Sequence, residues 1–131
     1  MTSIKSRIDF FDADAAGVMF YGKVFELCHS AFESFVASQK KYKEYFASTE
    51  FAFPIIHTEA AYTLPLIPGE EVEVEIFLGE TKNSSFSLHY RIKKASGEIA
   101  VEVKTVVVAV EKMKWQKIAL PPYINELLRT L

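Results

Sequence analysis

The sequence predicts an α+β domain in which a curved antiparallel sheet wraps around one long apolar helix. Three observations support this class: an apolar pattern of helical period in the first third of the chain, several later segments with the two-residue period of strands, and short turn sequences between them. The chain has 131 residues. This is the length of one domain on the usual scale of roughly 100 to 200 residues. We therefore expect a single domain over residues 1–131.

Composition excludes several classes of protein. The 15 Lys and Arg residues nearly balance the 17 Asp and Glu residues, which does not suit a surface built to bind nucleic acid or an anionic membrane. The lone Cys28 excludes an internal disulfide and a Cys-based zinc site, and indicates a reducing compartment. No run approaches the ~20 apolar residues of a membrane span, and the first residues lack a signal-type apolar stretch. We expect a cytoplasmic protein with no nucleic-acid partner and no membrane span.

The first expected elements are a short strand, a loop and the long helix. Residues 4–10 alternate loosely between apolar and polar, and residues 12–17 break that pattern because Asp and Gly favour turns. From residue 21 to 39 the apolar positions recur at helical spacing. Such a helix is normally buried on most sides, so we expect it to run through the core. Only a narrow polar seam remains, formed by Glu26, His29, Ser30 and Glu33.

The rest of the chain is expected to be mainly β. Residues 40–50 are polar and aromatic, which allows a second short helix that Pro54 ends. Residues 106–110 are apolar on both faces and mostly β-branched, which favours a central position for the last strand. A C-terminal helix is expected after Pro121 and Pro122. Strands are predicted over residues 55–64, 71–78, 86–93 and 98–111, with turns at 65–69, 83–84 and 95–97.

The segment from Asp12 to Tyr21 is the part of the chain that core packing explains least. Its sequence is Asp-Ala-Asp-Ala-Ala-Gly-Val-Met-Phe-Tyr. It places two carboxylates directly before the N-terminus of the long helix, where unpaired N–H groups and the positive end of the helix dipole favour negative charge. One interpretation is that Asp12 or Asp14 caps a turn. The other is acyl transfer, in which the helix N–H groups polarise a carbonyl oxygen while a carboxylate attacks it or activates water.

This ten-residue segment, followed by an aromatic-rich helix, resembles the opening motif of the 4-hydroxybenzoyl-CoA thioesterase family. The resemblance follows the order of elements over nearly the whole chain. Within the family, residues 25–34 and 51–57 are most similar to 1,4-dihydroxy-2-naphthoyl-CoA thioesterases of the quinone pathways. The resemblance implies a hotdog fold and a hydrolase that cleaves an aromatic acyl-CoA, in particular 1,4-dihydroxy-2-naphthoyl-CoA, into the free acid and coenzyme A.

The resemblance also implies roles for individual residues. Asp14 falls on the family's catalytic carboxylate, as nucleophile or general base. Gly17 falls on the glycine of the turn, and Tyr21 falls where a backbone N–H holds the thioester oxygen. No metal and no cofactor are implied, because coenzyme A is part of the substrate and then a product.

Lys82, Ser84 and Ser85 occupy the region in which the family carries its nucleotide-contacting residues, so the resemblance implies that they bind coenzyme A. Only Lys82 is basic there, whereas relatives can carry a denser basic run. Arg91, Lys93 and Lys94 lie on the next strand and offer further positive charge. A solvated strand face explains these three residues equally well.

Substrate-binding candidates lie around the helix start and along the polar seam. Phe20, Phe25 and Phe53 are candidate walls for a flat ring, although most aromatic residues at helical spacing belong to the core. His29 and Glu33 have the i, i+4 spacing of a side-chain pair, and they form either a polar strip, a subunit contact or part of the acyl pocket. Glu33 is also a lower-ranked catalytic candidate, since some hotdog thioesterases place a catalytic Glu on the helix.

The remaining histidines give less indication of a functional role. His57 begins a strand and suits core or pocket lining equally, whereas His89 is most simply a solvent-face residue. The three histidines have no metal-ligand spacing.

Exposed sheet edges and a single helix layer favour a homodimer or homotetramer, which the resemblance also implies, with active sites at subunit interfaces. Three alternatives stay open: another aryl- or short-chain acyl-CoA thioesterase, a hydratase, or a non-catalytic acyl-CoA-binding module. Hydratases normally pair a His with the carboxylate, and Asp14 has no His beside it in sequence.

Overall fold

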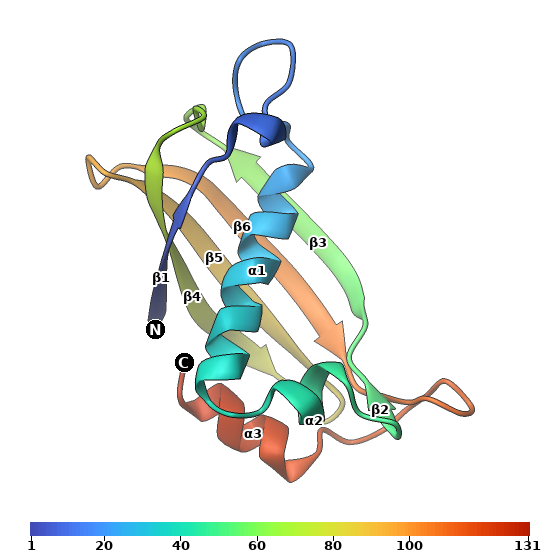
Figure 1. Cartoon of the computed structure of the whole chain (residues 1–131). Coiled ribbons are helices and arrows are strands. Elements are labelled where there is room, and N and C mark those ends of the chain that lie inside the picture. Colours follow the sequence, from blue (N-terminus) through green and yellow to red (C-terminus); the bar gives the residue numbers. More distant parts are fainter.

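Helix α1 lies across one face of a five-stranded antiparallel sheet in the computed structural model, which describes all of residues 1–131 (Figure 1). The strand order is β1-β4-β5-β6-β3, and a small second sheet has the order β2-β7-β8. Helices α2 and α3 lie near the C-terminal end of α1. The elements in chain order are β1 (Thr2–Arg7), the 3-10 helix η1 (Phe10–Asp12), α1 (Lys23–Ser38), α2 (Tyr42–Phe46), β2 (Phe51–Ala52), β3 (Ile55–Tyr62), β4 (Glu71–Thr81), β5 (Ser85–Lys94), β6 (Ile99–Val108), β7 (Val110–Glu111), β8 (Gln116–Lys117) and α3 (Pro122–Arg129).

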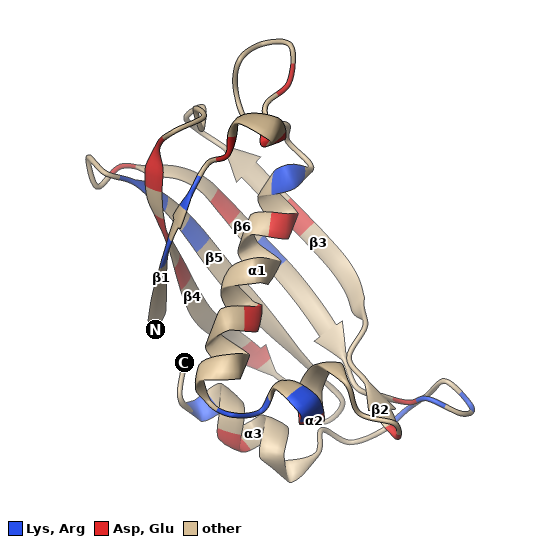
Figure 2. Cartoon of the chain, viewed as in Figure 1, with Lys and Arg blue, Asp and Glu red and all other residues tan.

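The alternation along the strands separates an apolar inner face from a charged outer face. On β4, Val72, Val74 and Ile76 are buried on the side of α1. On the outer face, oppositely charged residues stand opposite one another on neighbouring strands (Figure 2), an arrangement that stabilises a solvated sheet face. The rows are Lys5-Glu73-Lys93 and Glu75-Arg91-Glu102.

Helix α1 buries one apolar stripe against the sheet: Val24, Leu27, Cys28, Ala31, Phe32, Phe35 and Val36. Residues Tyr21 and Gly22, at the start of the predicted helix, form a turn instead. The expectation that the helix is buried on most sides is wrong for the single chain. His29, Ser30, Ser34 and Ala37 are exposed, because the sheet covers only one side and α2 covers part of another through contacts such as Phe32 with Tyr45.

The last predicted strand, residues 98–111, is divided between two sheets. β6 ends at Val108 and β7 begins at Val110 in the small sheet. β6 is an interior strand, as its apolar run predicts, but β5 occupies the middle because β3 lies beyond β6 as the edge strand. The first strand spans Thr2–Arg7 and not residues 4–10, since η1 begins at Phe10.

The predicted short helix within residues 40–50 and the C-terminal helix are both present, as α2 and α3. α3 starts with Pro122 in its first turn and buries Ile124, Leu127 and Leu128, which share one helix face. None of the helices combines the length and the hydropathy that crossing a bilayer requires.

Phe35 is at the centre of the helix–sheet contact, with a relative exposure of 1%. We predict that Phe35→Ala lowers the free energy of unfolding by about 3–5 kcal/mol, because it removes buried apolar surface and leaves a cavity. Ser34→Ala, one residue away but exposed, should change it by less than about 0.5 kcal/mol. Urea denaturation of both variants measures this. Equal effects of the two substitutions would contradict the packing described here.

Candidate active site

A tight turn over residues 13–19 holds Asp14 just before helix α1. The Asp14 N–H donates to the Val18 carbonyl at 2.9 Å, and the Gly17 N–H donates to the Asp14 carbonyl at 3.0 Å. One carboxylate oxygen, Oδ1 of Asp14, accepts the Ala16 N–H at 2.8 Å. Gly17 has a φ of +80°, a conformation that favours glycine, so its predicted role in the turn agrees with the backbone.

Backbone hydrogen bonds fasten this turn to the rest of the domain. The buried Met19 donates its N–H to the Leu66 carbonyl at 2.7 Å, and the Phe20 N–H donates to the Asp12 carbonyl at 2.8 Å. The carboxylate of Asp12 lies 3.9 Å from Nζ of Lys23. Asp12 thus supports the turn and the helix start, whereas the exposed Asp14 carboxylate has only the Ala16 N–H as a partner.

The start of α1 is not capped by a side chain. Gly22 is the N-cap residue, and no side chain accepts the first N–H groups of the helix. The N–H groups of Tyr21 and Gly22 make no hydrogen bond within the chain. Free N–H groups at the positive end of a helix dipole stabilise a partial or full negative charge.

Asp14 and Tyr21 line one cavity of about 300 Å³ beside the helix start. Its walls are otherwise mostly apolar and come from the turn, α1, the end of β3, the segment after β3, and β6: Val18, Met19, Val24, Tyr62, Thr63, Leu64, Pro65, Leu66 and Val101. The structure therefore brings the predicted carboxylate and the predicted N–H donor together. A carboxylate beside free N–H groups in an apolar cavity suits attack on a polarised carbonyl.

Tyr62 is a member of this cavity that the sequence reasoning did not single out. Its hydroxyl donates to the Tyr21 carbonyl at 2.7 Å. Its place near the end of the predicted strand over residues 55–64 is the signal that the sequence carries, whereas its contact with Tyr21 joins distant segments.

A second cavity of about 310 Å³ is lined by His29 and Phe53 with other aromatic residues: Tyr45, Phe46, Phe51 and Trp115. The ring of Phe53 stacks on Tyr45 at 4.6 Å between centroids, and His29 meets Phe46 edge-on at 5.7 Å. Within one chain this cavity does not include Asp14 or Tyr21. The substrate-binding candidates His29 and Phe53 therefore line a different cavity from the catalytic candidates Asp14 and Tyr21.

The other substrate-binding candidates lie outside both cavities. Phe20 is exposed and packs edge-on against Tyr21 at 4.6 Å, and Phe25 is partly buried against the core. Glu33 accepts a hydrogen bond from the Tyr42 hydroxyl at 3.0 Å, so the suggested pairing of Glu33 with His29 is not formed.

His57 is neither core nor pocket lining in the single chain. Its side chain is 56% exposed on the edge strand β3, with Nε2 lying 3.8 Å from Oε1 of Glu59. An edge strand has no neighbour to cover its outer residues, which the sequence pattern could not show.

The predicted coenzyme A residues Lys82, Ser84 and Ser85 lie at the turn between β4 and β5. This turn is at the end of the sheet opposite the Asp14 turn (Figure 1), so one chain does not bring the two together. Lys82 is exposed and lies 3.9 Å from Glu80.

The basic residues of β5 have acidic neighbours. Arg91 and Lys93 lie 3.4 Å from Glu102 and 3.8 Å from Glu75, and Lys94 lies 2.9 Å from Glu70. The Arg91 and Lys93 pairs agree with the solvated-face interpretation. Lys94 does not, because it stands opposite the inward-facing Val72 and its side chain is only 17% exposed.

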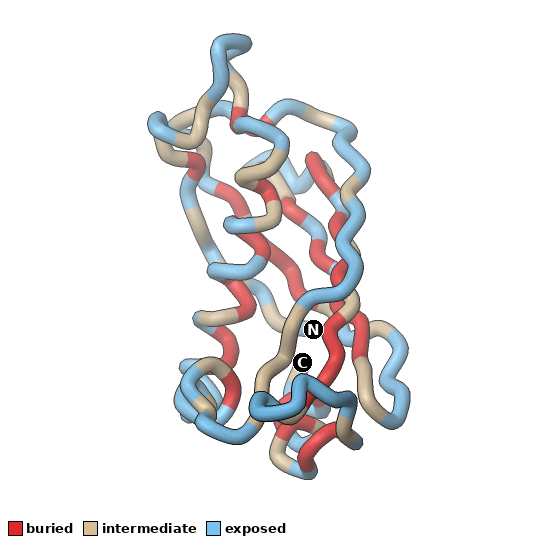
Figure 3. The backbone as a smooth tube through the Cα atoms, turned by 90° about the vertical axis from the view of Figure 1, so that its right-hand side faces the viewer, coloured by how far each residue is buried: buried red, intermediate tan, exposed pale blue.

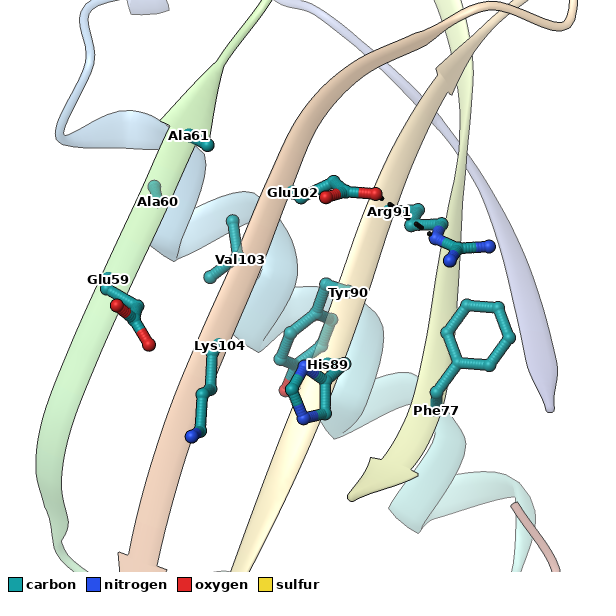
Figure 4. Close-up of a pocket in the computed structure, with 10 residues that line it drawn as sticks. All are labelled: Glu59, Ala60, Ala61, Phe77, His89, Tyr90, Arg91, Glu102, Val103 and Lys104. Carbon is teal, nitrogen blue, oxygen red and sulfur yellow. Dashed lines mark ion pairs between the residues drawn. The ribbon is translucent and has the colours of Figure 1, made fainter.

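A hollow of about 500 Å³ lies on the outer face of the sheet, away from α1 (Figure 4). Figure 4 shows His89, Lys104 and the Arg91–Glu102 ion pair on this surface, and the Arg91 guanidinium also lies 5.0 Å from the ring centre of Phe77. The position of His89 on this face agrees with the sequence expectation. Arg91 and Glu102 are paired with one another here, and none of the predicted catalytic residues is present.

Two further groups bear on the chemistry. Burial raises the pKa of Cys28 to about 12, so its thiol stays protonated at neutral pH and is a poor nucleophile. No group of three or more His, Cys, Asp and Glu side chains is arranged to hold a metal ion.

Comparison with known proteins agrees with the fold. The model of the thioesterase-like superfamily matches residues 8–128. A 1,4-dihydroxy-2-naphthoyl-CoA hydrolase of Gloeothece citriformis is 34% identical over 113 residues, covering 84% of this chain and 79% of the relative. One of the same name from Prochlorococcus marinus (strain NATL1A) is 32% identical, with 93% and 86% covered. The crystal structure of a 1,4-dihydroxy-2-naphthoyl-CoA thioesterase from Synechocystis superposes with a TM-score of 0.87 at 22% identity, covering 98% of this chain and 96% of that one.

The chain belongs to the thioesterase-like superfamily. The hotdog fold and the family resemblance expected from the sequence are confirmed.

We predict that Gly17→Ala disturbs the Asp14 turn. Placing a side chain at a φ of +80° costs roughly 1–2 kcal/mol of stability and moves the turn that carries the carboxylate. Gly97→Ala is a matched control, because Gly97 has a φ of +89° and open space around it but lies at another turn. Both variants should lose similar stability in thermal unfolding, and only Gly17→Ala should lose acyl-CoA hydrolysis. An equal loss of hydrolysis in both would contradict this assignment.

Proposed function

We propose that this chain is an acyl-CoA thioesterase that hydrolyses an aromatic acyl-CoA, with 1,4-dihydroxy-2-naphthoyl-CoA as substrate and the free acid and coenzyme A as products. The observation that carries the activity is the cavity shared by Asp14 and the uncapped start of α1. The names of the relatives at 34% and 32% identity support the acyl group and a place in menaquinone or phylloquinone synthesis. The proposal needs no cofactor, and it places the reaction in the cytoplasm.

In the proposed mechanism the thioester carbonyl oxygen accepts the Tyr21 N–H. This donor, at the positive end of the helix dipole, stabilises the negative charge that develops on the oxygen. The ionised Asp14 acts at the carbonyl carbon, either by removing a proton from attacking water or by direct attack followed by hydrolysis. In both routes the C–S bond breaks, and the net reaction adds water to give the carboxylic acid and the thiol.

We further propose that the working form pairs two chains through β3, as a homodimer or as a homotetramer built from it. Every residue of β3 except Ala60 is exposed, and Figure 3, which faces this side of the molecule, colours the edge largely pale blue. An exposed strand edge offers unpaired N–H and C=O groups to a second strand. An antiparallel twofold pair covers both edges at once.

Charge selects the register of this pairing. With Thr58 opposite its own copy, His57 stands against the partner subunit's Glu59, and inner-face residues stay on the inner face. Shifting the axis by one residue to Glu59 would place two like charges directly opposite, which is destabilising.

The antiparallel pairing also supports a site between subunits. The end of β3 at Tyr62 then lies beside the start of the partner's β3, which Phe53 and Pro54 precede. The aromatic cavity of one chain thereby approaches the Asp14 cavity of the other. The turn that carries Lys82 is at the same end of the sheet as the start of β3, so it comes to the same side.

The test of the activity is release of free thiol from a panel of acyl-CoAs by the wild type and by Asp14→Asn. We expect preference for 1,4-dihydroxy-2-naphthoyl-CoA over benzoyl-type, phenylacetyl-type and aliphatic esters. Asp14→Asn should lower turnover by about 10²–10⁴-fold, because the amide can neither accept a proton nor attack. Asp12→Asn is the matched control and should retain most activity, since the backbone carbonyl of Asp12 supports the turn.

Other results of that assay would contradict parts of the proposal. Asp14-dependent hydrolysis of an aliphatic ester would reject the aromatic substrate and keep the thioesterase. Tight acyl-CoA binding without turnover would support a binding module instead.

For the subunit pairing, we predict that Glu59→Lys weakens the dimer at least about tenfold, because it sets a positive charge against the partner subunit's His57 and removes a favourable pair. Glu71→Lys, an exposed charge reversal on β4, should leave the dimer intact. Sedimentation velocity over a concentration series measures both. A wild type that stays monomeric at micromolar concentration would contradict the proposed pairing.

A further inference from the structure

Tyr62 connects the edge of the sheet to the backbone at the helix start. Its hydroxyl donates to the Tyr21 carbonyl at 2.7 Å. Residues 13–22 receive no other hydrogen bond from a side chain of the sheet. Tyr62 is 47% exposed and lines the Asp14 cavity, so this bond lies at the candidate active site and not in the core.

The carbonyl that Tyr62 binds belongs to the same peptide group as the Gly22 N–H. In a planar trans peptide the C=O and N–H bonds point in opposite directions, so a fixed carbonyl fixes the direction of the N–H. A hydrogen bond accepted by the carbonyl also polarises the group and makes its N–H a stronger donor. The Gly22 N–H has no acceptor within the chain.

Nothing else holds this carbonyl as closely. The Val24 N–H reaches the Tyr21 carbonyl only at 3.4 Å, near the limit of a hydrogen bond. Gly22 carries no side chain and is not held by a cap. Without the Tyr62 hydroxyl, the peptide between Tyr21 and Gly22 would be free to tilt.

We propose that Tyr62 is a positioning residue for thioester hydrolysis, which orients the Gly22 N–H as a second donor to the thioester oxygen beside the Tyr21 N–H. This inference rests on the proposed function and adds a donor and its support to that site. Burial raises the pKa of the Tyr62 phenol, with smaller contributions from Cys28 and Tyr21, so the hydroxyl remains a donor across neutral pH.

Tyr62→Phe tests the proposal, because it keeps the ring and removes only the hydroxyl. We expect kcat to fall about 10- to 100-fold, since a misdirected donor loses most of its effect on the transition state, while KM changes less than about threefold. Tyr123→Phe is the matched control: it removes a hydroxyl that donates to the Glu44 carbonyl at 3.2 Å, away from the cavity. Tyr123→Phe should keep the wild-type kcat.

Two further measurements separate positioning from other roles. The pH profile of kcat should keep its wild-type shape in Tyr62→Phe, and loss of one limb would make Tyr62 an acid or base and overturn the proposal. In spectra of the ¹⁵N-labelled protein, the Gly22 amide proton should shift upfield in Tyr62→Phe and stay unchanged in Tyr123→Phe. An unchanged Gly22 resonance would also overturn it.

Assays of Asp14→Asn beside Tyr62→Phe distinguish a failure of the proposed function from a failure of the role proposed for Tyr62. If Asp14→Asn is inactive while Tyr62→Phe has the wild-type kcat, the proposed function stands and the role of Tyr62 is rejected. If neither the wild type nor the variants hydrolyse any acyl-CoA, the proposed function fails and the inference fails with it, whereas wild-type turnover by Asp14→Asn rejects only the catalytic role of Asp14.

Discussion

The packing of the apolar stripe of α1 on the inner face of the sheet is the contact on which the rest of the structure depends. Phe35 and Val36 on the helix, with Ile76 and Phe86 on the strands, are almost completely buried, and burial of such side chains is the main favourable term in folding. This contact sets where the helix begins. The Met19 bond to Leu66 and the Tyr62 bond to Tyr21 then attach the preceding turn to the same sheet. The position of Asp14 is therefore a consequence of core packing.

The uncapped start of α1 favours a negative charge beside it, and the missing cap costs some stability. A capping Ser, Thr, Asn or Asp in place of Gly22 would typically stabilise a helix by only about a few tenths of a kcal/mol, and here no side chain accepts the first N–H groups. Such unsatisfied donors beside a carboxylate are suited to a ligand oxygen that becomes negative. Departures from local preference are expected at functional sites, where the rest of the fold compensates for them. In this chain the 27-residue core cluster provides that compensation.

Periodicity predicted the long helix and the four long strands after it because each buries one face, which leaves a regular pattern in the sequence. The two-residue strands β2 and β8 are too short to carry a pattern. The motif around Asp14 and Gly17 could be read directly, since neighbouring residues form that turn. Tyr62, the Glu33–Tyr42 bond and the separation of Phe53 from Asp14 depend on contacts between distant segments. Exposure of His57 depends on β3 being an edge, which only strand order reveals.

The central claim is that the thioester is held at the start of α1 between two subunits. A crystal structure of Asp14→Asn with uncleaved 1,4-dihydroxy-2-naphthoyl-CoA tests it most directly. We expect the thioester oxygen to lie about 2.7–3.1 Å from the Tyr21 and Gly22 nitrogens, with the ring near Phe53 of the partner subunit. A thioester bound on the outer face of the sheet, or one whose oxygen lies away from the helix start, would contradict it.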